Sequence, residues 1–427
     1  MLPESASEPL SRRRRGLLGG IPALRHRNFR LFVVGQGISL VGYWMQSVAQ
    51  GWLVYRLDER PLDLGKVAFA GYLPILFLAP LAGVVADRLP RRPVLLVTQT
   101  LLMLLALALA VIVWRGAATV PMVIGFAAAS GLVGALDIPT RQSFLVEMAS
   151  PEDLPSAIAI NSTIFNGARI IGPAIAGSLV SVAGEAGCFF LNAASYLAVL
   201  AALLRMRLPR STRAPHGQPL AAGLLSGLRY VWSVPVLRNL LLLLGIVCAL
   251  GVQYVVLMPV FAKTVFDAGA EGYGLLLTAA GIGSMTSSLQ LATGHYSRVQ
   301  HRRNLLLGLG TFAVAVLGVS LSPRFEIALM CQVFAGWGMI RYLATTNTLL
   351  QLSVDEGYRG RMMGLHAVMF LGTQPIGGLV LGALAQEFGA RRAGLVSAAT
   401  ALGAAVWLAF RLRRVALRER RAEATAT

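Results

Sequence analysis

Two long apolar runs of this sequence are joined by the charged stretch Gly83-Val-Val-Ala-Asp87-Arg88-Leu-Pro-Arg91-Arg92. The pattern returns at a constant shift of 211, where Gly294, Arg298, Arg302 and Arg303 lie between two further apolar runs. A pattern that returns at a fixed distance indicates an internal repeat. The repeating unit here is a set of apolar segments with a charged connector.

The repeat reaches well beyond this connector. A shift of 211 places Arg27-Asn28-Phe29 on Arg238-Asn239-Leu240, each just ahead of an apolar run. A shift of 202 places Pro173 on Pro375. Two halves that repeat in parallel, with charged connectors between apolar segments, are typical of two-domain membrane transporters.

The composition argues against a water-soluble enzyme. Of the 427 residues, 56% are hydrophobic and 13% are charged, and the mean hydropathy is +0.66. Soluble domains carry about 25% charged residues. The formal charge of +19 would suit nucleic acid, but the cations lie between the apolar runs and not on one face of a folded domain. We therefore expect loops that face anionic lipid, and no nucleic-acid partner.

The apolar runs are long enough to cross a membrane, because a hydrocarbon core of about 30 Å takes about 20 helical residues. The twelve predicted spans are 30–55, 67–86, 93–114, 120–146, 155–183, 187–205, 236–262, 272–293, 304–321, 326–350, 360–386 and 392–412. The predicted fold is an all-α polytopic membrane protein. Its predicted parts are an N-terminal tail at 1–28, six-helix bundles at 29–205 and 236–414, a linker at 206–235 and a C-terminal tail at 415–427. Within the linker, residues 220–232 are expected to form an amphipathic helix on the membrane surface.

The positions of the cations predict the orientation. If both termini are cytoplasmic, the inner segments carry 28 Lys and Arg, the outer loops 8 and the spans 2, out of 38. This excess favours cytoplasmic termini in a multi-pass protein of the cytoplasmic (inner) membrane. Cys188, Cys248 and Cys331 lie apart inside apolar runs, with neither a CxxC pair nor a histidine cluster, so we expect buried thiols and no metal site.

The connector that begins at Gly83 resembles the signature of the major facilitator superfamily, and the resemblance covers about residues 24–414. It implies two pseudo-symmetric six-helix bundles, in which the glycine lets helices approach, the acid contacts a helix end and the arginines bridge the halves. Pro90 stands where a glycine is common, a departure from the signature that bears on the shape of the loop. The residues that the resemblance assigns to gating are Gly83, Asp87, Arg88, Arg91 and Arg92.

A second signature lies in the fifth predicted span. The segment Gly167-Ala-Arg-Ile-Ile-Gly172-Pro173-Ala-Ile-Ala-Gly177 resembles the antiporter signature of the same superfamily. Small residues at this spacing permit close helix contact, and Pro173 removes a backbone donor and kinks the helix. The resemblance implies export, with an inward proton flux as the energy source.

Two further segments narrow the resemblance. They are Asp137-Ile-Pro139-Thr-Arg141 and Asp355-Glu-Gly-Tyr-Arg359-Gly360-Arg361. Both are similar to segments of the branch that contains the bacterial enterobactin exporter, transmembrane secretion effectors and macrolide-efflux proteins. The segments indicate a family and name no substrate.

Polar residues at helical spacing predict a wet surface inside the protein. In the first span Gln36, Tyr43, Gln46 and Gln50 recur on one helix face, together with Ser39. Such a face should meet water or other helices and not lipid. Further candidates for the substrate cavity are Asn161, Phe165, Arg169, Trp337, Phe370 and Gln374.

Charged groups inside the spans are expected to be functional, since each costs about 2.5–3.5 kcal/mol at a helix centre. Asp137 and Arg341 occupy equivalent places in the two halves, in the fourth and tenth spans. The resemblance implies that these spans line the cavity, so we expect the two residues to face each other and to act in gating. The alternative is a pair between Asp137 and Arg91. For proton coupling the candidates are Asp137 and His366, whose ordinary pKa near 6.5 suits proton exchange.

These patterns predict a secondary active exporter of a small siderophore-like or drug-like molecule, acting as a monomer without a cofactor. No GxxxxGK[ST] motif is present, so ATP coupling within the chain is not expected. Arg169 and Arg341 against Asp137 leave about one positive charge inside, which favours anionic or neutral oxygen-rich substrates. The alternative for Arg169 is that it caps backbone carbonyls near Pro173. Alternatives for the whole chain are a non-transporting membrane scaffold and an importer.

Overall fold

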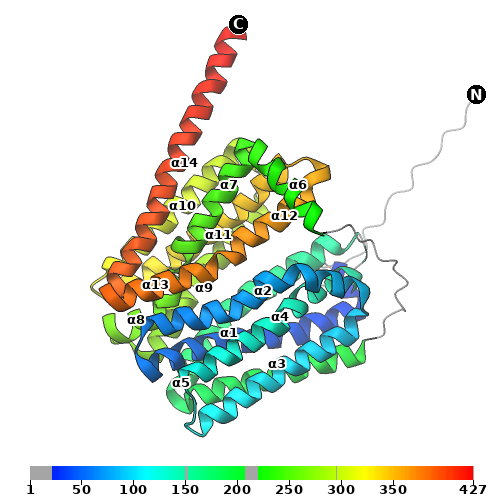
Figure 1. Cartoon of the computed structure of the whole chain (residues 1–427), viewed down its shortest axis with the longest axis vertical. Helices are drawn as coiled ribbons and strands as arrows, with labels where there is room; N and C mark the ends of the chain where they lie inside the picture. The colour runs from blue at the N-terminus through cyan, green and yellow to red at the C-terminus, as the bar shows by residue number, and fades with distance from the viewer. Residues whose placement is uncertain (1–21, 149, 151, 207–219, 295, 427) are drawn as a thin grey trace, which may run out of the picture.

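In a computed structural model of the chain, every regular element of the described residues is a helix (Figure 1). The structure describes residues 22–148, 150, 152–206, 220–294 and 296–426. The side chains of residues 79–88, 220–225, 298 and 415–426 lie outside this description.

The first half contains five helices, one of which is twice the usual length. They are α1 (Arg27–Asp58), α2 (Pro61–Arg88), α3 (Arg91–Trp114), α4 (Val120–Met148) and α5 (Leu154–Arg205). As one straight helix, the 52 residues of α5 would be about 78 Å long at 1.5 Å per residue, more than twice a hydrocarbon core of about 30 Å. The backbone turns at Gly184, where φ is 68° and ψ is 178°, a conformation that favours glycine. Thus α5 contains two spans, 154–183 and 185–205.

The second half repeats this plan with two interrupted spans. Its elements are α7 (Pro235–Ile246), η3 (Val247–Gly251), η4 (Val252–Leu257), α8 (Met258–Val260), η5 (Phe261–Val265), α9 (Gly269–Thr293), α10 (Arg298–Leu321), α11 (Phe325–Ser353), η6 (Glu356–Tyr358), α12 (Arg359–Ala367), η7 (Val368–Gly372), α13 (Gln374–Phe388) and α14 (Ala390–Ala426). Residues 235–265 form one span, and residues 356–388 form another. In the described part of the chain, 11 helices are long and apolar enough to cross a membrane. Because α5 counts twice, twelve spans result, and the predicted all-α fold is confirmed.

Each half is held together by its own helix pairs. In the first half α1 packs on α5 and α2 on α4, and in the second half α11 packs on α9 and α10. The two largest contacts between the halves are those of α2 with α13 and of α5 with α9, and smaller ones join α2 to η4 and η7 and α1 to α8 and α9. Figure 1 shows the first half below the second, with the two bodies meeting near α8 and α13 and diverging from there.

The linker contains a helix that is attached to the second half. The amphipathic helix predicted at 220–232 is present as α6 (Leu220–Ser233). Its Tyr230 stacks on Tyr358 with ring centroids 4.0 Å apart, and its hydroxyl lies 2.9 Å from the Asp355 carboxylate. Placement of α6 on a membrane surface stays a prediction.

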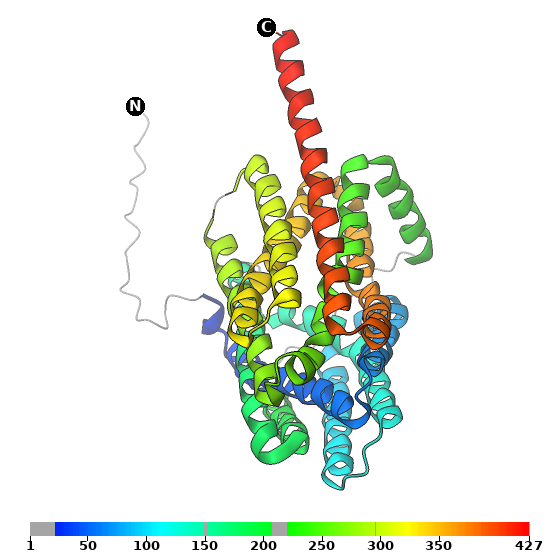
Figure 2. The same cartoon turned by 90° about the vertical axis from the view of Figure 1, so that its left-hand side faces the viewer.

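Two names for the membrane sides are used from here on. Successive spans alternate in direction, so one side of the membrane holds the beginning of α1 and the ends of α5 and α14. The segment that contains α6 connects the halves on this same side, which we call the linker side. The opposite side is the far side. Figure 2 shows α14 running well past the other helices toward its C-terminal end.

Candidate functional site

On the far side the two halves touch directly. Lys263 Nζ lies 2.6 Å from Glu59 Oε1, an ion pair that joins the halves. A Cβ added to Gly65 of α2 would lie 2.5 Å from the backbone oxygen of Gly378 in α13. Such an approach is possible only without a side chain, so glycine permits tight closure here.

The predicted antiporter signature lies at the other contact between the halves. A Cβ added to Gly177 of α5 would lie 3.1 Å from the backbone of Glu271 in α9. From the opposite helix, a Cβ added to Gly274 would lie 2.5 Å from the carbonyl oxygen of Pro173. Backbone therefore meets backbone between α5 and α9, which closes this part of the interface.

The other two glycines of the signature differ from each other. A Cβ added to Gly172 would lie 2.5 Å from Cβ of Trp44, so this glycine allows α5 to approach α1 within the first half. A Cβ added to Gly167 would meet nothing within 4 Å. Close helix contact is thus observed at Gly172 and Gly177, whereas the expectation is wrong for Gly167, which faces open space.

Toward the linker side, side chains between the halves remain accessible. Tyr43 and Phe165 lie midway along their spans, yet 48% and 43% of their surfaces are exposed. The α1 residue Val34 is 63% exposed and lies on the helix face opposite Tyr43. This opposite face of α1 is the one that faces lipid. Tyr43 therefore belongs to a surface between the halves, which we call the inner surface. The halves are joined on the far side, and their helices diverge toward the linker side (Figure 1).

Arg169 is the cation of the inner surface. Its guanidinium carbon lies 5.6 Å from the centre of the Trp44 ring. The Trp44 ring also meets Phe165 and Tyr43 edge-on, each with centroids 5.7 Å apart. The inner surface as we use the term consists of these four residues.

Arg169 also lacks the partners that would neutralise it. Among the residues the structure describes, no carboxylate lies within 4.0 Å of its guanidinium, and the guanidinium donates no hydrogen bond to a backbone carbonyl. The predicted alternative, a cap on carbonyls near Pro173, is therefore not what the structure shows. The buried Nε1 of Trp44 also finds no hydrogen-bond partner in the part of the chain that the structure describes. Both groups are donors, and together they are suited to an oxygen-bearing anion.

The polar stripe of α1 only partly reaches the inner surface. Gln36 is 4% exposed and is packed inside the first half, so the expectation that it lines the cavity is wrong in this conformation. Gln46 accepts a hydrogen bond of 2.6 Å from Asn192 of α5. Gln50 is half-buried. Of the predicted α1 cavity residues, Tyr43 is the accessible one.

Asp137 is buried in a polar network within the first half. It is 1% exposed, and Oδ1 accepts hydrogen bonds from Thr98 Oγ1 at 2.7 Å and Gln99 Nε2 at 2.8 Å. Its other carboxylate oxygen lies 3.0 Å from Nη2 of Arg141, one turn along α4. The carboxylate is thus fully partnered between α3 and α4.

Arg341 occupies the equivalent network of the second half. Its guanidinium donates to Oδ1 of Asn304 in α10 at 3.0 Å and to Oε1 of Gln290 in α9 at 2.9 Å. It also lies over the Trp337 ring, 4.6 Å from the centroid. Trp337 donates to the same Gln290 oxygen at 3.0 Å. Arg341 therefore ties three helices of its own half together.

Both predicted partners of Asp137 are wrong in this conformation. Arg341 is held by neutral amides in the other half, and Arg91 pairs with Glu147 at 2.9 Å. The physical reason is that a nearer cation, Arg141, stands at the i+4 position on the same helix, where oppositely charged side chains meet. A role for Asp137 and Arg341 in gating stays a prediction.

Arg141 also changes the predicted charge balance. The expected excess of one positive charge came from counting Arg169 and Arg341 as positive and Asp137 as negative. Because Arg141 already neutralises Asp137, both of the other arginines are left without a carboxylate, and the excess inside the spans becomes two. The i+4 spacing from Asp137 was the signal in the sequence that could have identified Arg141.

We expect Arg141→Gln to lower the free energy of unfolding by about 3 kcal/mol, because it leaves a buried carboxylate without its cation. This is the lower end of the usual range, since the Arg141 side chain is 28% exposed. The double variant Asp137→Asn with Arg141→Gln should recover most of the loss. Thermal unfolding in detergent measures both, with exposed Arg413→Gln as the control. Equal stability of all variants would contradict the pairing.

The gating signature is described only in part. The side chains of Gly83, Asp87 and Arg88 lie outside the described residues. Arg92 donates to the backbone oxygen of Leu204 at 2.9 Å, and like the Arg91 pair this contact lies within the first half. Bridging of the halves by these arginines therefore stays a prediction for another conformation.

The remaining predicted residues lie in α5 and in the span 356–388. His366 stacks on Phe370 with centroids 6.0 Å apart, and Gln374 Nε2 donates to the backbone oxygen of Phe370 at 2.9 Å. Asn161 is half-buried, one turn from Phe165. His366 has no carboxylate within 4.0 Å among the described side chains.

Comparison with known proteins identifies transporters. Residues 19–426 match the family described as transmembrane secretion effector. The staphyloferrin A transporter of Staphylococcus aureus (strain NCTC 8325 / PS 47) is 25% identical over 84% of this chain and 90% of its own length. The multidrug efflux pump Tap of Mycolicibacterium fortuitum is 27% identical over 83% of this chain and 87% of its own.

Solved structures share the fold at low identity. A POT family transporter in complex with a thioalcohol conjugated peptide matches with a TM-score of 0.72 at 14% identity, over 91% of this chain and 96% of that one. A bacterial homologue of the human lysosomal transporter Spinster, inward-facing and occupied, matches with a TM-score of 0.70 at 14% identity, over 91% and 97%.

Proposed function

The chain belongs to the transmembrane secretion effector family of major facilitator transporters, and on this premise we propose that it exports a small anionic or oxygen-rich organic molecule in exchange for protons. It is a multi-pass membrane transporter and not an enzyme. Its relatives include proteins named for staphyloferrin A transport and for multidrug efflux, and the efflux name supports export over import.

The observation that carries the proposal is the unpaired Arg169 on an accessible aromatic surface. A cation at membrane depth without a carboxylate is costly, and a bound anion is a natural partner. The neighbouring rings of Trp44, Phe165 and Tyr43 offer flat apolar contacts, and the free Trp44 Nε1 offers a donor. A compound with carboxylate or hydroxyl oxygens and a planar or apolar body fits this chemistry.

Alternating access is supported by the shape of the interface. The halves are joined through glycines and an ion pair on the far side, while the inner surface is accessible from the linker side. We propose that the linker side is cytoplasmic, because the cation excess of the sequence lies there. In that orientation this conformation receives substrate from the cytoplasm.

Proton coupling has two candidates with different surroundings. Asp137 is fully partnered, so it can exchange a proton only after the Arg141 side chain turns away from it or α4 moves away from Thr98 and Gln99 of α3. His366 is half-buried and stacks on Phe370. No carboxylate among the described side chains pairs with its ring. We propose His366 as the residue that exchanges the proton in this conformation, with Asp137 as the second candidate.

We expect purified protein in inside-out liposomes to accumulate an anionic siderophore only when the lumen is acidic. The variants His366→Ala and Asp137→Asn are each tested for loss of the dependence on the proton gradient. A membrane-impermeant thiol reagent, reacting with a cysteine placed in α6, checks the orientation of the protein in the liposome. If both variants keep full dependence on the proton gradient, neither residue is the obligate carrier. No movement of any probe would favour a scaffold, and transport only in the reverse direction would favour an importer.

A further inference from the structure

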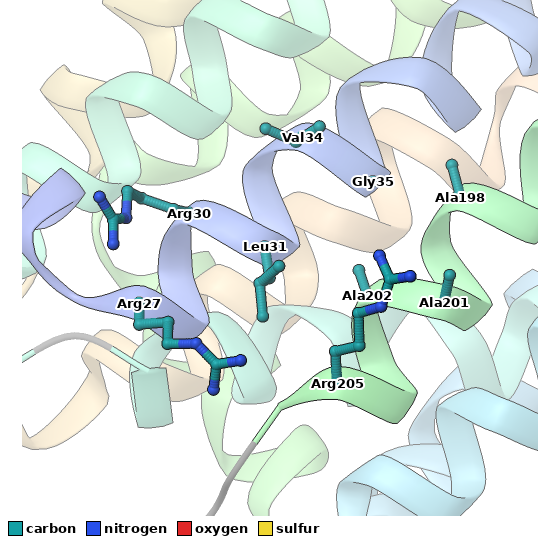
Figure 3. A pocket seen from close by; sticks show the side chains of 9 residues that line it. All are labelled: Arg27, Arg30, Leu31, Val34, Gly35, Ala198, Ala201, Ala202 and Arg205. Atoms are coloured by element: carbon teal, nitrogen blue, oxygen red, sulfur yellow. The ribbon is translucent and has the colours of Figure 1, made fainter.

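A groove lies between the beginning of α1 and the end of α5 on the linker side, apart from the inner surface (Figure 3). Its volume is about 470 Å³. Arg27 and Arg30 of α1 and Arg205 of α5 stand at its rim, and its floor is made of small or apolar residues. In Figure 3, Arg27 projects toward the end of α5 that carries Arg205, whereas the guanidinium of Arg30 points away from the groove.

The groove faces lipid. Val34, which lines it, is 63% exposed and lies on the α1 face opposite Tyr43, so the groove and the inner surface are on opposite sides of the helix. The floor is shallow because α1 and α5 touch: a Cβ added to Gly35 would lie 3.0 Å from Cβ of Ala202. The result is an apolar channel beside the helix pair, with an arginine on either side of its linker-side end.

The charge at this end is not balanced by the protein. Arg27, Arg30 and Arg205 are exposed, and none has a carboxylate within 4.0 Å among the described residues. The first turn of α1 contains no acidic residue, although two of the arginines lie there. The N-terminal end of a helix carries a partial positive charge, so cations in this turn are unfavourable unless an anion is nearby. The groove thus combines an apolar floor with unmet positive charge at the level of lipid headgroups.

We propose that the groove binds one anionic phospholipid from the leaflet on the linker side. The phosphate lies between Arg27 and Arg205, and one acyl chain follows the floor along Val34, Gly35 and Ala201. Arg30 contributes to the field at the rim without contacting the phosphate. A bound lipid would fix the start of α1, the helix that carries Tyr43 and Trp44, against the end of α5.

The test is lipid binding by the purified full-length protein in detergent, measured by native mass spectrometry during titration with phosphatidylglycerol or phosphatidylcholine. We expect one tightly retained phosphatidylglycerol. Arg27→Gln with Arg205→Gln should weaken that binding by roughly 30-fold, at about fivefold for each arginine near a membrane surface. The matched control, Arg413→Gln with Arg414→Gln, removes the same charge from the exposed linker-side end of α14 and should leave the affinity unchanged. Equal affinities in the two double variants would overturn the proposal.

Two further measurements separate a lipid from a free phosphate group. Ala201→Phe fills the floor of the groove and leaves every arginine in place, so it should also weaken phosphatidylglycerol binding. Inorganic phosphate at the same concentration should not displace the lipid. Unchanged binding in Ala201→Phe, or full competition by inorganic phosphate, would show that no acyl chain lies in the groove and would overturn the lipid assignment.

Discussion

Gly274→Val is expected to abolish transport while the protein remains folded in the membrane. A Cβ at this position would lie 2.5 Å from the carbonyl oxygen of Pro173 and 2.9 Å from Cα of Gly177. Both atoms belong to the backbone of α5, so α5 and α9 must separate, and this pair is one of the two largest contacts between the halves. Overpacking of this kind costs roughly 1–3 kcal/mol. The cost falls on the conformation that is closed on the far side, so the population shifts away from it by about 5- to 150-fold.

The shift is measured by the accessibility of a cysteine at Ser47, an exposed residue on the same face of α1 as Tyr43. Cys331, which is only partly buried, is first replaced by serine. In Gly274→Val, reagent from the far side should reach the cysteine faster than in the parent protein. Gly167→Val is the matched control, because its Cβ would meet nothing within 4 Å in the same signature. Equal transport by the two glycine variants would contradict a special role for the α5–α9 contact.

The sequence was sufficient to predict the number of spans and the class of fold. Span length depends on apolar composition, which is local, and a hydrocarbon core of about 30 Å leaves little freedom. The linker helix α6 could also be predicted, because its signal is likewise a local pattern of apolar residues. The turn inside α5 was also predicted, since the spans 155–183 and 187–205 leave only residues 184–186 between them, and the structure places the turn at Gly184. The positive φ of Gly184 could not be predicted, because nothing local distinguishes this glycine from the others.

The partners of buried charges were harder to predict, because they depend on which helix faces meet. Asp137 was expected to pair across the halves or with Arg91, but its carboxylate is held by α3 and by Arg141 of its own helix. The i+4 rule would have favoured Arg141, yet it cannot show that Thr98 and Gln99 lie opposite. Such pairs depend on tertiary packing between helices.

The same limit applies to the candidate site. The helical spacing of the polar residues in α1 places them on one face of the helix. One part of that face contacts neighbouring helices and another part contacts water, and the spacing does not distinguish the two parts. Gln46 was therefore indistinguishable in the sequence from Tyr43, although Asn192 binds Gln46 and Tyr43 stays accessible. Arg169 could be predicted as important because a charge at membrane depth needs a reason. Its lack of a partner is visible only in the structure.

Arg169→Gln is expected to reduce export of an anionic substrate by about 30-fold or more while sparing a cationic probe. Removing one member of a desolvated charge pair costs about 2–5 kcal/mol, and here the other member would be the substrate. Arg169→Lys keeps the charge and should retain part of the activity, although a compact ammonium cannot reproduce the planar contact of the guanidinium with Trp44.

Arg341→Gln separates a substrate contact from a general effect of interior charge. Both substitutions remove one positive charge from the spans, but Arg341 is already bound by Asn304 and Gln290, whereas Arg169 has no such partner. If Arg169 binds the substrate directly, export of an anionic siderophore by Arg169→Gln should fall well below that by Arg341→Gln, and export of ethidium should change little in either. Equal losses would mean that the field of the whole interior selects the anion. A parent protein that exports ethidium well and anionic siderophores not at all would exclude both explanations, because two interior arginines without a carboxylate partner among the described residues should not favour a cation.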